Sequence, residues 1–169
     1  MTKPIMNLDE VQFDDIEENG RFTSRRGQIS DHIGAQKMAY NYTIVPPGKT
    51  QCPFHNHHSE EELFVILEGE GELRFGDRRF AIRANDVIAC PPGGPEVAHQ
   101  IINTGSTPMR YLSISTNSEV ETCEYPDSQK MLVYSGERGK RRLRKMFRVE
   151  DGQREYYDRE PTSEPIDPK

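Results

Sequence analysis

Hydrophobic and polar residues alternate in short runs between residues 38 and 116, and Gly, Pro, Asn and Asp interrupt these runs. Alternation with a period of two places apolar side chains on one face of a strand, and the interruptions supply the turns that hairpins need. Apolar residues do not recur in this region every three to four positions, as they would in an amphipathic helix. The pattern therefore predicts an all-β sandwich or barrel, with strands at 38–45, 51–57, 62–67, 71–75, 79–82, 86–90, 98–103 and 110–115.

The segments on either side of this region are less regular. An acidic run at 14–20 predicts a short helix or turn, residues 25–27 predict a loop, and residues 130–134 predict one further strand. The last residues are polar and rich in Pro, a composition typical of disorder. The predicted organisation is an N-terminal arm (1–37), a barrel core (38–116), a C-terminal extension that packs on the barrel or on a partner chain (117–159) and a disordered tail (160–169).

Composition limits the classes of partner. The chain has 169 residues, of which 33% are hydrophobic and 30% charged, and its net charge is −6. This length fits one domain, and the negative charge argues against a general nucleic-acid binder. No run approaches the roughly 18 apolar residues of a membrane-spanning helix, and the first residues lack the apolar core of a signal peptide. We therefore expect a cytoplasmic protein that binds neither nucleic acid nor membrane.

Two further features have an ordinary and a functional interpretation. Cys52, Cys90 and Cys123 are odd in number and widely spaced, which favours free thiols over a disulfide. The basic residues between 138 and 148 are able to bind a phosphate or nucleic acid. A solvated segment that offsets the acidic tail is favoured, because aromatic residues other than Phe147 are missing from it.

Three histidines and one glutamate form a candidate metal site. His55 and His57 share one face of their predicted strand, because alternate side chains point the same way. Glu62 begins the next strand after a short loop, and His99 lies on a later strand. Imidazole nitrogens and carboxylate oxygens suit first-row divalent metals, and this set leaves positions open for water or substrate. A single histidine in a strand is more often structural or exposed, so the whole arrangement carries the prediction.

The spacing of these residues resembles the first of the two motifs of the cupin superfamily. Gly48 precedes His55 and His57, and six residues separate Glu62 from Gly69. This spacing favours Glu62 over the two glutamates before it as the fourth ligand.

The second cupin motif is matched between residues 85 and 103. Asn85 stands where the motif usually has Gly, and Asn tolerates the left-handed backbone of such a turn. A Pro-Pro-Gly sequence follows, and His99 and Asn103 keep the spacing of the motif. Residues 94–98 lengthen the loop before His99, which brings Glu96 within possible reach of the site.

The resemblance implies a fold and a class of function. It implies a cupin-type double-stranded β-helix, or jelly-roll barrel, that holds one divalent transition metal ion (Fe, Mn, Ni or Zn) at the four residues. It also implies an enzyme that acts on a small polar organic molecule, of the dioxygenase, decarboxylase or isomerase type, with catalytic residues unassigned. A non-catalytic, metal-dependent binding or sensor module is the alternative, and a structural role is the third interpretation.

The barrel interior is expected to supply the rest of the site. If the metal-binding face is the interior, alternation predicts that the small-molecule ligand or substrate contacts Tyr40, Tyr42, Gln51, Phe64 and Ser113. The sheet edges of a small barrel need covering, and the two arms are suited to this. We therefore also predict a homodimer.

Overall fold

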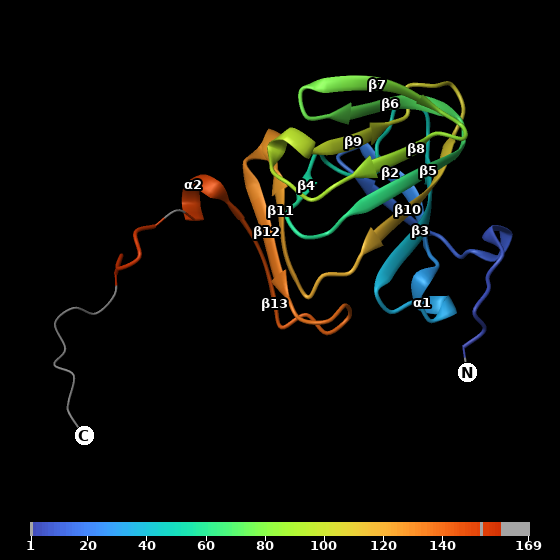
Figure 1. Cartoon of the computed structure of the whole chain (residues 1–169). Coiled ribbons are helices and arrows are strands. Elements are labelled where there is room, and N and C mark those ends of the chain that lie inside the picture. The colour runs from blue at the N-terminus through green and yellow to red at the C-terminus, as the bar shows by residue number, and fades with distance from the viewer. Residues whose placement is uncertain (1, 153, 160–169) are drawn as a thin grey trace.

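The computed structural model describes residues 2–152 and 154–159, and antiparallel β-sheet dominates it (Figure 1). The largest sheet has the order β1-β2-β3-β10-β5-β8, with bounds Asp14–Glu18, Phe22–Gln28, Met38–Val45, Met109–Thr116, Glu62–Glu68 and Val87–Cys90. A second sheet has the order β7-β6-β9, with bounds Arg78–Arg83, Glu70–Phe75 and His99–Ile102. The third sheet has the order β13-β12-β11-β4, with bounds Leu143–Arg148, Lys130–Ser135, Val120–Tyr125 and Asn56–His57. The all-β prediction is confirmed.

The helices are short. The α-helices are α1 (Ser30–Ile33) and α2 (Val149–Gly152), and single 3-10 turns occur at Leu8–Glu10, Pro95–Val97 and Pro126–Ser128. Within the described part of the chain, no helix has the length and apolar character needed to cross a bilayer. The disorder predicted for 160–169 lies outside the described residues.

Most predicted strands are found within two residues of their expected ends, but three local predictions are wrong. The acidic run expected as a helix or turn is strand β1, and the expected loop at 25–27 belongs to β2. These strands form a hairpin whose turn contains Asn19 and Gly20, both with positive φ. Of the strand expected at 51–57, only β4 forms. Strand pairing decides the first two cases, since β1 pairs with β2 and β2 pairs with β3. The side chains of β1 are mostly exposed and carry little apolar pattern of their own.

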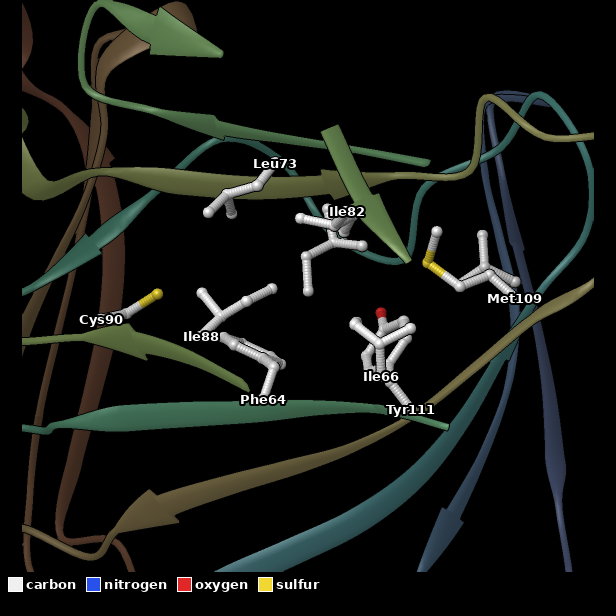
Figure 2. Packing of buried hydrophobic residues seen from close by; sticks show 10 residues of the cluster. Phe64, Ile66, Leu73, Ile82, Ile88, Cys90, Met109 and Tyr111 are labelled. Atoms are coloured by element: carbon white, nitrogen blue, oxygen red, sulfur yellow. The ribbon is translucent and has the colours of Figure 1, made fainter. Parts of the chain in front are cut away.

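The main core lies between the six-stranded sheet and the three-stranded sheet. Figure 2 shows side chains from both layers pointing toward one another. Complete burial of an Ile, Leu or Phe side chain contributes about 1.5–3 kcal/mol, so this cluster is the main apolar contribution to the barrel. Its buried members are Val45, Phe64, Ile66, Leu73, Ile82, Ile88, Cys90, Ile101, Met109 and Tyr111.

A second apolar cluster covers the outer face of the large sheet. It contains Val11, Ile29 and Tyr42 as buried members, and Tyr40 and Leu112 pack against it. The N-terminal segment thus covers a sheet face that would otherwise meet water. Tyr40 and Tyr42 of β3 belong to this second cluster, so their side chains lie on the outer face of the sheet and not in the barrel interior.

The third sheet joins the C-terminal segment to the barrel. Strand β11 pairs with β4 through Cys123 opposite His57 and Glu124 opposite Asn56. In Figure 1 the strands β11, β12 and β13 stand together as one layer beside the barrel. Residues far along the chain are therefore hydrogen-bonded to the short strand that carries one predicted metal ligand.

Candidate metal centre

Backbone pairing brings the predicted ligands together. The amide of His55 donates to the carbonyl of His99 at 3.2 Å, and the amide of His99 donates back to the carbonyl of His55 at 2.7 Å. His57 lies in β4, two residues beyond His55, and Glu62 begins β5. Because these positions are fixed by backbone hydrogen bonds, the fold of the backbone itself brings the four side chains close to one another.

The three predicted histidine side chains converge on one oxygen atom of the fourth predicted ligand, Glu62. The Oε2 atom of Glu62 lies 2.9 Å from Nε2 of His99, 3.5 Å from Nε2 of His57 and 3.7 Å from Nε2 of His55. The His55 ring centroid lies 4.8 Å from that of His99 and 5.1 Å from that of His57. Three imidazoles and a carboxylate, from separate segments of the chain, therefore face a common point.

The donor set fits a divalent transition metal. The Nδ1 atom of His55 lies 2.8 Å from the carbonyl oxygen of Pro53, so this nitrogen donates its proton and leaves Nε2 as a lone-pair donor. The Nδ1 atom of His99 lies 3.4 Å from the carbonyl oxygen of Val97, which favours the same tautomer. The ligand atoms of His55, Glu62 and His99 all lie within 4.8 Å of one another, close enough to share one ion.

The electrostatics of His55 and Glu62 suit these two residues to bind a cation. Burial lowers the pKa of His55 to about 4, and the neighbouring His99 adds to this effect, so His55 is neutral at neutral pH. Burial raises the pKa of Glu62, but the hydrogen bond with His99 and the nearby His57 and His55 outweigh it and lower that pKa to about 2. A neutral imidazole and an ionised carboxylate are the protonation states that metal coordination requires.

A buried carboxylate of the third sheet supports the loop between β4 and β5. The side chain of Glu121 is fully buried and accepts hydrogen bonds from the backbone amides of His58, Ser59 and Glu60, at distances down to 2.6 Å. Its Oε2 atom lies 3.8 Å from Nδ1 of His57. Burial raises the pKa of Glu121, but His57 and the backbone donors outweigh it, so the carboxyl group is ionised. Glu121 therefore fixes the loop between two ligands.

The candidate metal centre opens into a cavity of about 310 Å³. Three of the residues predicted to contact a substrate, Gln51, Phe64 and Ser113, line it. The Oε1 atom of Gln51 accepts a hydrogen bond from the Tyr111 hydroxyl at 2.9 Å, whereas Ser113 Oγ has no hydrogen-bond partner. The cavity thus combines candidate metal ligands with polar atoms that have no hydrogen-bond partner among the described residues.

Tyr40 and Tyr42 do not line this cavity, and their expected orientation is wrong. Both belong to the second apolar cluster on the outer face of β3, where Tyr42 packs against Phe13 with ring centroids 5.4 Å apart. The opposite face of β3 contributes Ala39 and Asn41 to the cavity wall. Alternation along β3 does not say which of its two faces is interior. The N-terminal segment packs on the face that carries Tyr40 and Tyr42, so the opposite face is the interior one.

The inserted loop and one cysteine also differ from expectation. Glu96 is exposed and accepts a hydrogen bond from the Gly94 amide at 2.9 Å, so it does not join the cavity wall. Cys52 does line the cavity, and its Sγ atom lies 3.8 Å from Nδ1 of His55. In a regular strand at 51–57, alternation would place Cys52 on the opposite face from His55. Residues 51–54 form bends rather than a strand, so alternation does not apply there.

Several cavity residues were not predicted, and most of them come from outside the two motifs. Glu60 accepts hydrogen bonds from the Tyr134 hydroxyl at 2.7 Å and from the Ser118 amide at 2.9 Å. The ring of Tyr125 stacks on that of His55 with centroids 6.0 Å apart. Arginines from β2 and from the segment after β12 complete the wall. No local pattern marks these residues, because only the pairing of β2 with β3 and of β11 with β4 brings them to the site.

Comparisons with known proteins agree with this architecture. A family model described as a cupin domain matches residues 41–115. An uncharacterized protein of Methanocaldococcus jannaschii is 34% identical over 79 residues, which make up 47% of this chain and 60% of that protein. The oxalate-binding protein of Thermotoga maritima is 34% identical over 70 residues, 41% of this chain and 54% of that protein. The chain thus spans little more than half the length of these relatives.

Two solved structures match nearly the whole chain. A putative sugar phosphate isomerase from Acidithiobacillus ferrooxidans superposes with a TM-score of 0.77 at 22% identity, covering 89% of this chain and 96% of that one. A sugar phosphate isomerase of the cupin superfamily from Silicibacter pomeroyi gives 0.76 at 22% identity, covering 92% and 98%. At this identity the likeness establishes the fold. Residues 41–115 therefore match the cupin family model, and the chain has the cupin-type double-stranded β-helix fold of these structures.

Proposed function

We propose that the protein is a metal-dependent enzyme acting on a small polar organic molecule, with one Fe, Mn, Ni or Zn ion held by His55, His57, Glu62 and His99. The observation that carries this proposal is the convergence of three Nε2 atoms on Glu62 Oε2 at 2.9–3.7 Å, at the wall of a polar cavity. A divalent ion held there would act as a Lewis acid or redox centre toward an oxygen atom of the substrate.

The chain's own residues supply positioning and a proton-transfer group. Phe64 presents an apolar surface to the cavity, and Gln51 and Ser113 offer polar atoms that orient a ligand. Glu60 lines the same cavity and is held by Tyr134 and the Ser118 amide, which makes it the candidate general acid or base. Tyr125 of the third sheet stacks on the His55 ring and would shield that side of the ring from water.

Non-catalytic ligand binding is the second candidate function. One relative with 34% identity over 70 residues is described as an oxalate-binding protein, whereas the two structures that cover nearly all of this chain are described as sugar phosphate isomerases, one of them putative. The titratable Glu60 in the cavity favours the enzyme. Turnover of a bound small molecule would distinguish the two functions, since a sensor or carrier binds without converting its ligand.

Elemental analysis of the purified full-length protein tests the metal site. We expect about one equivalent of Fe, Mn, Ni or Zn per chain and a lower Tm after chelation, because a ligand that binds only the folded state stabilises it. Restoring each metal in turn should restore the Tm and identify the ion that supports turnover. A protein that stays metal-free after supplementation, with an unchanged Tm, would contradict the proposal.

We also propose that the protein forms a homodimer in the cytoplasm. Three observations support this: β1, β8 and β13 are edge strands, Phe80 and Val87 are 43% and 65% exposed, and the three cysteines are free. Unpaired edges and exposed apolar side chains favour association, and free thiols are typical of reducing compartments. Light scattering at micromolar concentration should give twice the chain mass, and a monomer mass would contradict the dimer.

A further inference from the structure

We propose that the cavity beside the metal centre contains an oxyanion subsite formed by Arg26 and Arg141, so that the substrate carries a phosphate or carboxylate group. The inference rests on the proposed function, because it names the chemical class of molecule that the same cavity would take. Both arginines line the cavity together with His55, His57 and Glu62. Both also lie outside the segment that the cupin family model matches.

Arg26 is a buried donor without a partner. Strand β2 pairs with β3 so that Arg26 stands opposite Thr43, whose side chain is fully buried. The Nε atom of Arg26 is inaccessible to solvent and has no hydrogen-bond partner, and within the described part of the chain Arg26 forms no ion pair. An unsatisfied, partly buried guanidinium is costly, and an anion in the cavity would remove that cost.

Arg141 is a second positive charge, and no carboxylate of residues 2–152 and 154–159 forms an ion pair with it. Its Nη1 atom donates to the carbonyl oxygens of Ser118 and Gly136, and its guanidinium lies 3.9 Å from the centroid of the Tyr134 ring. These contacts hold the side chain in place but leave its charge uncompensated. Its Nη2 and Nε atoms have no hydrogen-bond partner in residues 2–152 and 154–159, so they remain as donors for a ligand.

A third arginine on the cavity wall provides a contrast. Arg138 donates to Ser30 Oγ at 3.1 Å and to Gln28 Oε1 at 2.9 Å, and it lies 3.4 Å from Asp31 Oδ2. Its donors and its charge are already used within the protein. Arg138 therefore stabilises the junction between the N-terminal and C-terminal segments and is not assigned to the subsite.

Other polar atoms on the wall add acceptors and donors for the same ligand. Asn41 Oδ1 and Ser113 Oγ are buried without hydrogen-bond partners, and both residues line the cavity. Their strands pair so that Asn41 stands directly opposite Ser113. A planar guanidinium binds carboxylate and phosphate oxygens through paired hydrogen bonds, and hydroxyl groups beside the anion suit such neighbours. The wall thus fits an anionic, hydroxylated small molecule better than a neutral one.

Calorimetric titration of the full-length protein with inorganic phosphate and with malonate tests the subsite. The protein is first treated with a chelator, so that the anions cannot bind through a metal ion, and ionic strength is held constant with chloride. We expect at least one of the two anions to bind, and Arg26→Gln to weaken it by about tenfold or more, because a charge-assisted contact is lost. A response to phosphate alone indicates a phosphate ester as substrate, and a response to malonate alone indicates a carboxylate.

The control is a neighbour on the same strand. Arg25→Gln removes the same charge from the other face of β2, where Arg25 Nε is paired with Asp15 Oδ1 at 3.1 Å, and it should leave anion affinity within about twofold. Arg141→Gln should weaken binding as Arg26→Gln does, and Arg141→Lys, which keeps the charge, should weaken it less. The Tm of each variant is measured in parallel to identify loss of folding.

The failures of the two proposals are distinguishable. Absence of phosphate and malonate binding, or equal binding by wild type and Arg26→Gln, overturns the oxyanion subsite even if the protein holds its metal. Loss of anion binding in Arg25→Gln to the same extent also overturns it, because the effect would then be one of overall charge. A protein that takes up no metal after supplementation, but still binds the anion through Arg26, overturns the proposed function and leaves the subsite standing.

Discussion

His99→Ala is expected to lower the affinity for the divalent metal ion by more than about 100-fold, because loss of even an outer-shell partner of a metal ligand typically costs 10–100-fold. His99 is 3% exposed, and its Nε2 atom makes the shortest contact to Glu62 in the site, 2.9 Å. Without it, Glu62 keeps only the more distant His55 and His57. Metal content after dialysis, and metal titration followed by fluorescence or calorimetry, measure the effect.

His58→Ala is the matched control for this substitution. His58 is adjacent to the ligand His57, but 41% of its side chain is exposed and it lies 3.5 Å from Glu124 instead of facing the centre. We expect its metal affinity to stay within about twofold of wild type. Equal metal content in His99→Ala and wild type, with both proteins folded, would remove His99 from the ligand set.

Glu121→Ala is expected to destabilise the protein by about 2–4 kcal/mol, since each buried donor left without an acceptor costs about 1–3 kcal/mol. The amides of Ser59 and Glu60 would lose their acceptor, while the amide of His58 also donates to the Thr122 carbonyl at 2.9 Å. The loop that joins β4 to β5 would loosen, so we also expect weaker metal binding. Urea unfolding of the metal-depleted protein measures the change in the free energy of unfolding separately from metal affinity.

Two further variants serve as controls for the loss of stability expected in Glu121→Ala. Glu119→Ala removes an exposed carboxylate from the same segment and should change the free energy of unfolding by less than about 0.5 kcal/mol. Glu121→Gln keeps one acceptor oxygen and should lose less stability than Glu121→Ala. If Glu121→Ala unfolded at the same urea concentration as wild type, the carboxylate would not be the support that its hydrogen bonds indicate.

The four residues of the candidate metal centre could be singled out from the sequence because their spacing is local. His55 and His57 lie two residues apart, Glu62 keeps a fixed distance to Gly69, and His99 keeps a fixed distance to Asn103. Turns between strands require particular residues, and Asn85 has the positive φ of 75° that its place in the motif predicts. Short spacings of this kind are set by backbone geometry, so they carry over from the sequence to the fold.

The cavity wall could not be predicted in the same way. Alternation places Tyr40 and Tyr42 on one face of β3 and Asn41 on the other, but it does not say which face is interior. That choice depends on residues 6–13, which pack against the tyrosines and have only a weak pattern of their own. Cys52 reaches the site because its segment is bent rather than a regular strand, and Glu60 does so because Tyr134 and Ser118 hold it.

By itself the sequence determined the strand periodicity, the turns and the three His and one Glu that the structure brings to one point. Only the tertiary structure decided what surrounds that point, because Arg26 arrives through the pairing of β2 with β3, and Glu121 and Arg141 arrive with the third sheet. Strand pairing between segments far apart in the chain depends on packing and hydrogen bonding of the whole fold, and no local pattern encodes it. Local motifs thus place the candidate ligands, whereas long-range contacts place the residues of the cavity wall around them.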